Sequence, residues 1–188
     1  MFVLREPSPE QIGDFLASQR NSNFSYPHTG ATRTGIPRGF VIDHNRMELG
    51  RGQDAFERAK RALCAWKMFA LSWLNLSPKD ARIIPGTTVA VVSRQFGFWA
   101  LNGCRIVYTI DEPDRFGFAY GTLSAHAEIG EERFTVELQP SNESVWYDIL
   151  AFSKPRPSVR LAYPFARMLQ KRFARDSMAA MRQAVATS

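Results

Sequence analysis

The 188-residue sequence has few cysteines and histidines and no long apolar segment. Its two cysteines, Cys64 and Cys104, lack the short spacing of metal ligands, so a metal site built on paired cysteines is excluded, and we expect two buried thiols in a reducing compartment. No apolar run approaches the roughly 18 residues that span a membrane, and charges follow the start too soon for a signal peptide. We therefore expect a soluble cytoplasmic protein with no membrane span and no metal.

Signatures of common enzyme and cofactor classes are also missing. The sequence has no G-x-S-x-G, no H-E-x-x-H and no phosphate loop. Residues 50–55 do match G-x-G-x-x-A, but the preceding strand contains Asp43, Arg46 and Glu48 where a dinucleotide fold needs a buried apolar run. We interpret these glycines as a tight turn and expect no cofactor.

Positive charge is concentrated near the C-terminus. Of the formal net charge of +6, residues 154–188 carry eight Lys or Arg against Asp176 alone, whereas residues 111–148 carry nine acids against two arginines. No aromatic side chains alternate with the basic ones, as a stacking platform for nucleic acid would need. A solvated helix face explains the charge, and we expect no nucleic-acid partner.

The longest helical pattern covers residues 163–185. Pro164 suits the first turn of a helix, where its missing N–H is no loss. Apolar residues then recur at steps of three, four and seven and predict one apolar face: Phe165, Met168, Leu169, Phe173, Ala180, Met181 and Ala184. Basic residues take other directions, so we expect this face to cover a partner surface supplied by the rest of the chain.

The first half of the chain predicts three short elements. Ser8 and Gln11 form a capping box that begins a helix ending near residue 18, and residues 24–39 are too rich in glycine and proline for a regular element. Residues 40–49 read as a strand. A helix from about residue 54 carries an apolar stripe with a break expected near residue 67: Phe56, Ala59, Leu63, Trp66, Ala70 and Trp73.

The second half changes to the period of two that is typical of strands. The predicted strands cover residues 88–95, 99–110, 115–123, 133–138 and 145–153, separated by turns at Gly97, 111–114, Gly130 and 141–142. The short connections indicate an antiparallel meander. We predict an α+β fold in which a curved antiparallel sheet of about six strands grips the long C-terminal helix, with one or two short helices after the first strand.

Two segments are expected within one structural unit. Residues 1–39 form an N-terminal helix and a wrapping loop, and residues 40–188 form the sheet-and-helix domain. The strand 145–153 is apolar on both faces, so its outer face needs cover from residues 1–39 or from a second copy in a homodimer. This face motivates one functional alternative, a protein–protein interaction module.

One loop gathers residues with acid–base potential. His126 lies near Glu131 and Glu132, and an imidazole held by a carboxylate is suited to proton transfer near neutral pH. The alternative is a loop-capping network in which the two carboxylates accept backbone hydrogen bonds. The sequence favours this second interpretation, because a lone histidine near acids is a weakly specific pattern.

Five groups of residues together resemble an uncharacterised family, domain of unknown function nineteen-ninety. They are Phe24-Ser25-Tyr26-Pro27 with Gly30-Ala31-Thr32; Leu49-Gly50-Arg51-Gly52 with Phe56; Gly121-Thr122-Leu123 with His126 and residues 130–134; Ala151-Phe152-Ser153; and Leu169-Gln170-Lys171-Arg172-Phe173. The resemblance spans about residue 24 to the C-terminus. The family is similar to the START-like helix-grip superfamily of the birch-pollen-allergen type, which implies a cavity between sheet and C-terminal helix that binds lipids, hormones or polyketides.

We therefore expect a protein that binds a small, largely apolar ligand. Aromatic side chains combine an apolar body with a polar group, and with two polar residues of the N-terminal loop they are the expected lining: Tyr26, Thr32, Trp66, Trp99, Tyr108, Phe118, Tyr120 and Trp146. For each aromatic residue the alternative is that it simply fills the core, and the sequence favours neither. The alternative, which the resemblance also allows, is a hydrolase, cyclase or isomerase using His126 with Glu131 or Glu132 as acid and base. The sequence favours binding over catalysis.

Overall fold

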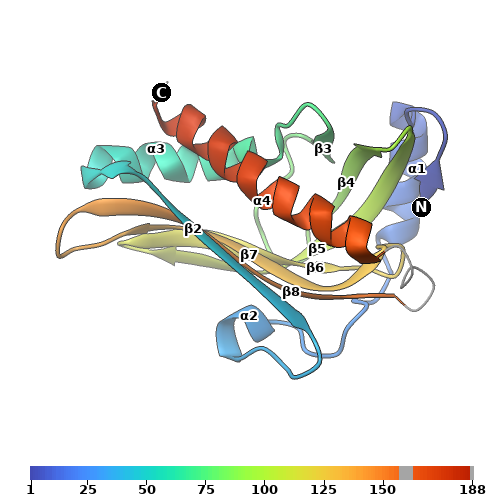
Figure 1. The fold of residues 1–188 in the computed structure, drawn as a ribbon, viewed down its shortest axis with the longest axis horizontal. Helices are drawn as coiled ribbons and strands as arrows, with labels where there is room; N and C mark the ends of the chain where they lie inside the picture. Colours follow the sequence, from blue (N-terminus) through green and yellow to red (C-terminus); the bar gives the residue numbers. More distant parts are fainter. Residues whose placement is uncertain (157–162, 187–188) are drawn as a thin grey trace.

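A curved antiparallel sheet is the centre of the computed structural model, which describes residues 1–156 and 163–186 (Figure 1). Within these residues the sheet has eight strands, seven of them in the order β2-β8-β7-β6-β5-β4-β3, with β1 paired to β5. The strands are β1 (Phe2–Val3), β2 (Val41–Arg51), β3 (Leu74–Ser77), β4 (Thr88–Gln95), β5 (Phe98–Glu112), β6 (Arg115–Thr122), β7 (Glu128–Leu138) and β8 (Ser144–Pro155). The predicted α+β helix-grip architecture is confirmed, with β1 and β3 added to the expected strands.

The predicted terminal helix is α4 (Tyr163–Ala186), which lies across the concave face of the sheet (Figure 1). Its buried face contains Phe173, Ala174, Ser177, Met181 and Val185. Phe165 and Met168, expected on the buried face, are 58% and 48% exposed. The last turns of α4 therefore pack on the core, whereas the first two turns leave large apolar side chains open to solvent.

The predicted break in the second helix is confirmed, and the helix ends three residues before Lys67. Helix α3 (Gly52–Cys64) buries Phe56, Ala59 and Leu63 completely and ends before Trp66, whose φ of 53° is left-handed. The 3-10 helix η1 (Lys67–Phe69) follows. Together α3, η1 and α4 cover one face of the sheet, because their apolar stripes share a single core with its strands.

The N-terminal segment covers the other face. Helix α1 (Pro9–Gln19) begins with the predicted capping box of Ser8 and Gln11, and its Phe15 packs against β4 and β5. The short helix α2 (Ala31–Thr34) lies under the sheet, on the side opposite α4 (Figure 1). Residues 24–40 thus cover the outer face of β8 around Phe152, as one of the two expectations for this strand required. The boundary at residue 39 stays a prediction.

Two local predictions are wrong. Gly130 does not form a turn: it lies within β7, and the turn before that strand occupies residues 123–127. Cys64, expected to be buried, is exposed at the end of α3, whereas Cys104 is buried in β5.

No helix in the described part of the chain has the length and apolarity needed to cross a membrane.

Candidate functional site

A cavity of about 1060 Å³ lies between the concave face of the sheet and the first half of α4. The sheet provides a continuous wall, because alternate residues of each strand point to this face. Most of the lining is apolar, including Trp73, Leu74, Val91, Ile149, Leu169, Phe173 and Met178. The cavity is therefore mainly apolar, with a small number of polar groups on its wall.

Glu132 and Tyr120 form a polar pair on this wall. They are opposite each other on β7 and β6, and the Tyr120 hydroxyl donates to Oε2 of Glu132 at 2.8 Å. Burial, reinforced by the carboxylates of Glu128 and Asp43, raises the pKa of Glu132 to about 7, although the Tyr120 hydrogen bond acts in the opposite direction. The cavity thus contains a carboxyl group that changes its charge near neutral pH.

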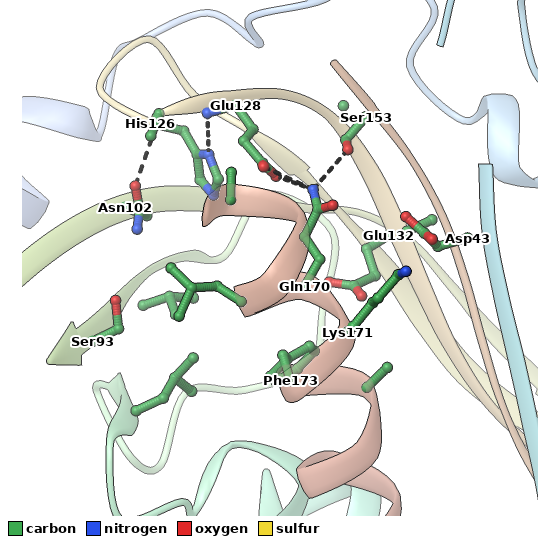
Figure 2. A pocket seen from close by; sticks show the side chains of 18 of the residues that line it. Asp43, Ser93, Asn102, His126, Glu128, Glu132, Ser153, Gln170, Lys171 and Phe173 are labelled. Carbon is green, nitrogen blue, oxygen red and sulfur yellow. Dashed lines mark hydrogen bonds between the residues drawn. The ribbon is translucent and has the colours of Figure 1, made fainter. Parts of the chain in front are cut away.

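A second polar group ties α4 to the sheet (Figure 2). The amide nitrogen of Gln170 donates to both oxygens of Glu128, each at 2.7 Å, and to the Ser153 hydroxyl at 2.9 Å. Arg167 forms a two-point ion pair with Asp43, with Nη2 and Oδ1 2.7 Å apart. Burial raises the pKa of Glu128. These contacts hold the start of α4 over β2, β7 and β8.

His126 lines the same end of the cavity but is not bonded to either predicted partner. Its Nδ1 accepts the backbone N–H of Glu128 at 2.9 Å, which leaves the proton of the neutral ring on Nε2. Burial, with the positive charges of the N-terminal amine and Arg156, lowers the pKa of His126 to about 3. The ring therefore stays neutral at physiological pH and accepts a backbone hydrogen bond of its own loop.

Four aromatic side chains, three of them exposed and Phe98 half-buried, lie at the mouth of the cavity, where its lining meets solvent. Phe96, at the tip of the β4–β5 hairpin, contacts Phe165 of α4 with ring centroids 5.7 Å apart. Phe2 and Phe98 form a second edge-to-face pair at 5.8 Å. All four side chains belong to the lining, so they give the mouth an apolar rim.

Glu131 lies on the opposite face of β7 and not beside His126. Its carboxylate accepts the Tyr26 hydroxyl at 2.6 Å, the backbone N–H of Gly30 at 2.6 Å, and both the N–H and the hydroxyl of Thr32. Gly121 permits this contact, because a Cβ there would lie 2.2 Å from the Tyr26 hydroxyl oxygen. The hydrogen bonds to Glu131 therefore hold residues 26–32 against the outer face of the sheet. Tyr26 and Thr32 do not line the cavity.

Five other residues expected around a ligand also lie elsewhere. Trp66 and Phe118 pack together in the core with ring centroids 4.8 Å apart, and Trp66 donates to the Ala81 carbonyl. Trp99 packs against α1, the Tyr108 hydroxyl bonds Thr32 on the outer face, and Trp146 lies under the Arg46 guanidinium. Of the eight expected lining residues, Tyr120 alone faces the cavity.

Several residues that line the cavity were not predicted from the sequence. For three of them the sequence contains a periodic signal. Glu128, Gly130 and Glu132 are two residues apart, so they share the inner face once β7 begins at residue 128. Assigning a turn to Gly130 hid this pattern. Asp43, Ser153 and Gln170 carry no comparable signal, because strand pairing and the position of α4 bring them together. Among the described residues, no three His, Cys, Asp or Glu side chains are grouped as metal ligands.

Comparison with known proteins agrees with the predicted family. Residues 25–180 match the family described as "Domain of unknown function (DUF1990)". A similar protein, the UPF0548 protein of Dictyostelium discoideum, is 34% identical over 210 residues, covering 100% of this chain and 97% of the relative.

Solved structures with low sequence identity share the fold. Ara h 8.0201 matches with a TM-score of 0.52 and 12% identity, covering 80% of this chain and 100% of the other. The di-domain ARO/CYC BexL from the BE-7585A biosynthetic pathway matches with a TM-score of 0.54 and 12% identity, covering 84% of this chain and 53% of the other. At this identity the likeness concerns the architecture alone.

Proposed function

We propose that this protein, which belongs to the DUF1990 family, binds a small, largely apolar ligand between the sheet and α4. The family description names no activity, so the proposal is argued from the cavity itself. The observation that carries the proposal is the volume of about 1060 Å³ with a mainly apolar lining. Pockets of roughly 300 to 1,000 Å³ with this kind of wall are typical of sites for small molecules. The apolar mouth supports entry of such a ligand.

A fluorescence titration with N-phenyl-1-naphthylamine tests the proposal, because this dye brightens in apolar surroundings. Ala151 lines the cavity from β8, so Ala151→Trp should fill part of it and weaken dye binding at least about tenfold, or roughly 1.4 kcal/mol. Ala17→Trp, exposed on α1, is the matched control and should bind as the parent does. Equal binding by all three proteins would place the dye outside the cavity and contradict the proposal.

Acid–base catalysis is the second candidate, and one observation favours it. Glu132 has a pKa of about 7 inside an apolar chamber, and such a carboxyl group can exchange a proton with a bound molecule near neutral pH. The pairing of Glu131 with His126 has no support, because their side chains lie on opposite sides of the sheet or bond elsewhere. Turnover of a bound compound that stops in Glu132→Gln would support catalysis, and recovery of the unchanged compound would support binding alone.

The cytoplasmic location and the homodimer stay predictions. Dimerisation would need a surface other than the part of β8 around Phe152, which the protein's own residues 24–40 cover. Light scattering of the purified protein distinguishes the two states.

A further inference from the structure

The carboxylates of the cavity wall differ in how many of their oxygen atoms have a hydrogen-bond partner. Gln170 engages both oxygens of Glu128, and Arg167 engages both oxygens of Asp43. Glu132 instead receives a single hydrogen bond, from Tyr120 to Oε2. Within residues 1–156 and 163–186, Oε1 of Glu132 has no hydrogen-bond or ion-pair partner, and the half-buried side chain lines the cavity. Glu132 therefore offers an acceptor to whatever enters the chamber.

The surroundings of Glu132 are acidic. Glu128 on its own strand and Asp43 on β2 are the nearest carboxylates, and both raise its pKa. Tyr120 on β6, Cys104 on β5 and Tyr147 on β8 remain uncharged near neutral pH, because burial raises the pKa of each. On α4, Lys171 is exposed and also lines the cavity, and within the described residues it makes no ion pair with Glu132.

An unpaired carboxylate in an apolar chamber is unfavourable, and a donor that reaches it removes the cost. A cation gains more than a neutral donor, because a charge-assisted hydrogen bond is the stronger kind. An anionic head would instead approach Glu132, Glu128 and Asp43, although Arg167 already neutralises Asp43. Lys171 and Arg175 of α4 also line the cavity, but the charged groups that act on Glu132 are the carboxylates of Glu128 and Asp43, so a donor head is favoured over a free carboxylic acid at this position.

We infer that the ligand has an apolar body carrying a hydrogen-bond-donating head, optimally a protonated amine, and that Oε1 of Glu132 accepts this head while the body packs against Ile149, Leu169, Phe173 and Met178. The inference rests on the proposed function, since it requires a ligand in the cavity. It adds the chemical class of the ligand and the residue that selects it.

Three compounds with the same hydrocarbon chain separate the head group from the body. Dodecylamine, 1-dodecanol and dodecanoate should each be titrated against bound N-phenyl-1-naphthylamine at pH 8, below their micelle concentrations. The amine should displace the dye at a concentration about tenfold lower than the alcohol, and the acid should be the weakest. Lowering the pH to 6 should reduce the preference for the amine, because Glu132 then gains a proton.

The variant Glu132→Gln identifies the selecting residue. It should reduce the preference for amine over alcohol from about tenfold to less than about threefold, because the neutral amide no longer provides a charged acceptor for the ammonium group. Glu137→Gln, on the opposite face of the same strand, is the control and should keep the preference. Thermal unfolding of each variant shows that it is folded, and binding of the alcohol reports an intact cavity.

The outcomes separate the two proposals. Binding of all three compounds without preference for the amine, or a preference that survives Glu132→Gln, would overturn the ligand class and leave the apolar binding function standing. Failure of the dye and of all three compounds to bind would overturn the binding function, and the ligand class would fall with it.

Discussion

Replacing Glu132 by glutamine should remove a large part of the pH dependence of stability. The pKa of this carboxyl group is raised from 4.5 to about 7 by burial, so the folded protein binds a proton more tightly than the unfolded chain does. A carboxyl group of this kind contributes its full stability below pH 4.5 and loses it as the pH rises through 7. At about 1.4 kcal/mol for each tenfold change in affinity, the raised pKa corresponds to about 3 kcal/mol between pH 4.5 and pH 8.

Urea unfolding followed by tryptophan fluorescence at pH 4.5, 6, 7 and 8 measures this effect. From pH 4.5 to pH 8 the free energy of unfolding of Glu132→Gln should increase by about 3 kcal/mol relative to that of the parent protein, because only the parent loses the contribution of the buried carboxyl group. Tyr120→Phe should act in the opposite way, because loss of its hydrogen bond raises the pKa of Glu132 further and extends the decline to higher pH. A difference between Glu132→Gln and the parent that stays constant with pH would refute the buried position of this side chain.

Three further predictions concern helix α4, the hydrogen bonds of Glu131 to residues 26–32, and the aromatic residues at the mouth of the cavity. Phe173→Ala, in the buried face of α4, should lower the free energy of unfolding by on the order of 3 to 5 kcal/mol. Arg182→Ala, at an exposed position of the same helix, should lower it by less than about 0.5 kcal/mol. Equal effects of the two variants in urea unfolding would contradict the packing of this helix. Glu131→Gln should speed amide hydrogen exchange in residues 24–34 roughly tenfold or more, because a glutamine side chain cannot accept all four hydrogen bonds. Unchanged exchange would mean that Glu131 does not hold this segment on the sheet. Phe165→Ala should raise the dissociation rate of bound dye by about threefold or more in stopped-flow measurements, and an unchanged rate would argue against exit through this mouth.

The architecture could be predicted because its signals are periodic and local. The period of two in β4 to β8 and the helical stripe of α4 each follow from the need to bury one face. The capping box of Ser8 and Gln11 is equally local, and it begins α1 as predicted. These features need no knowledge of which parts of the chain meet.

The site could be predicted only in part, because it depends on which face of the sheet each residue occupies. Glu131 and Glu132 are neighbours in sequence, yet the first holds α2 on the outer face and the second lies in the cavity. A register shift between Ile106 and Tyr108 has a similar effect: Ile106 is opposite Tyr120 on the inner face, whereas Tyr108 is opposite Ala119 on the outer face. An irregularity of one residue thus places Tyr108 on the outer face, away from the cavity in which it was expected.

The N-terminal loop shows the same limit. Its composition indicates a segment wrapped against the surface, but nothing in residues 24–39 tells which face it covers. The outer face of β6 accepts this segment because Gly121 has no side chain there. The Tyr26 ring occupies the space that a Cβ at residue 121 would need. Tyr26 and Thr32 were therefore expected in the cavity although they lie behind its wall.

The position of a bound apolar molecule is the most direct test of the account. Isotope-filtered nuclear Overhauser measurements on labelled protein with unlabelled 1-dodecanol report which side chains contact the hydrocarbon chain. The account predicts contacts to the methyl groups of Ile149, Leu169 and Met178, which line the cavity. Contacts confined to exposed side chains such as Ile42 and Ile84, or no contacts under saturating alcohol, would contradict it.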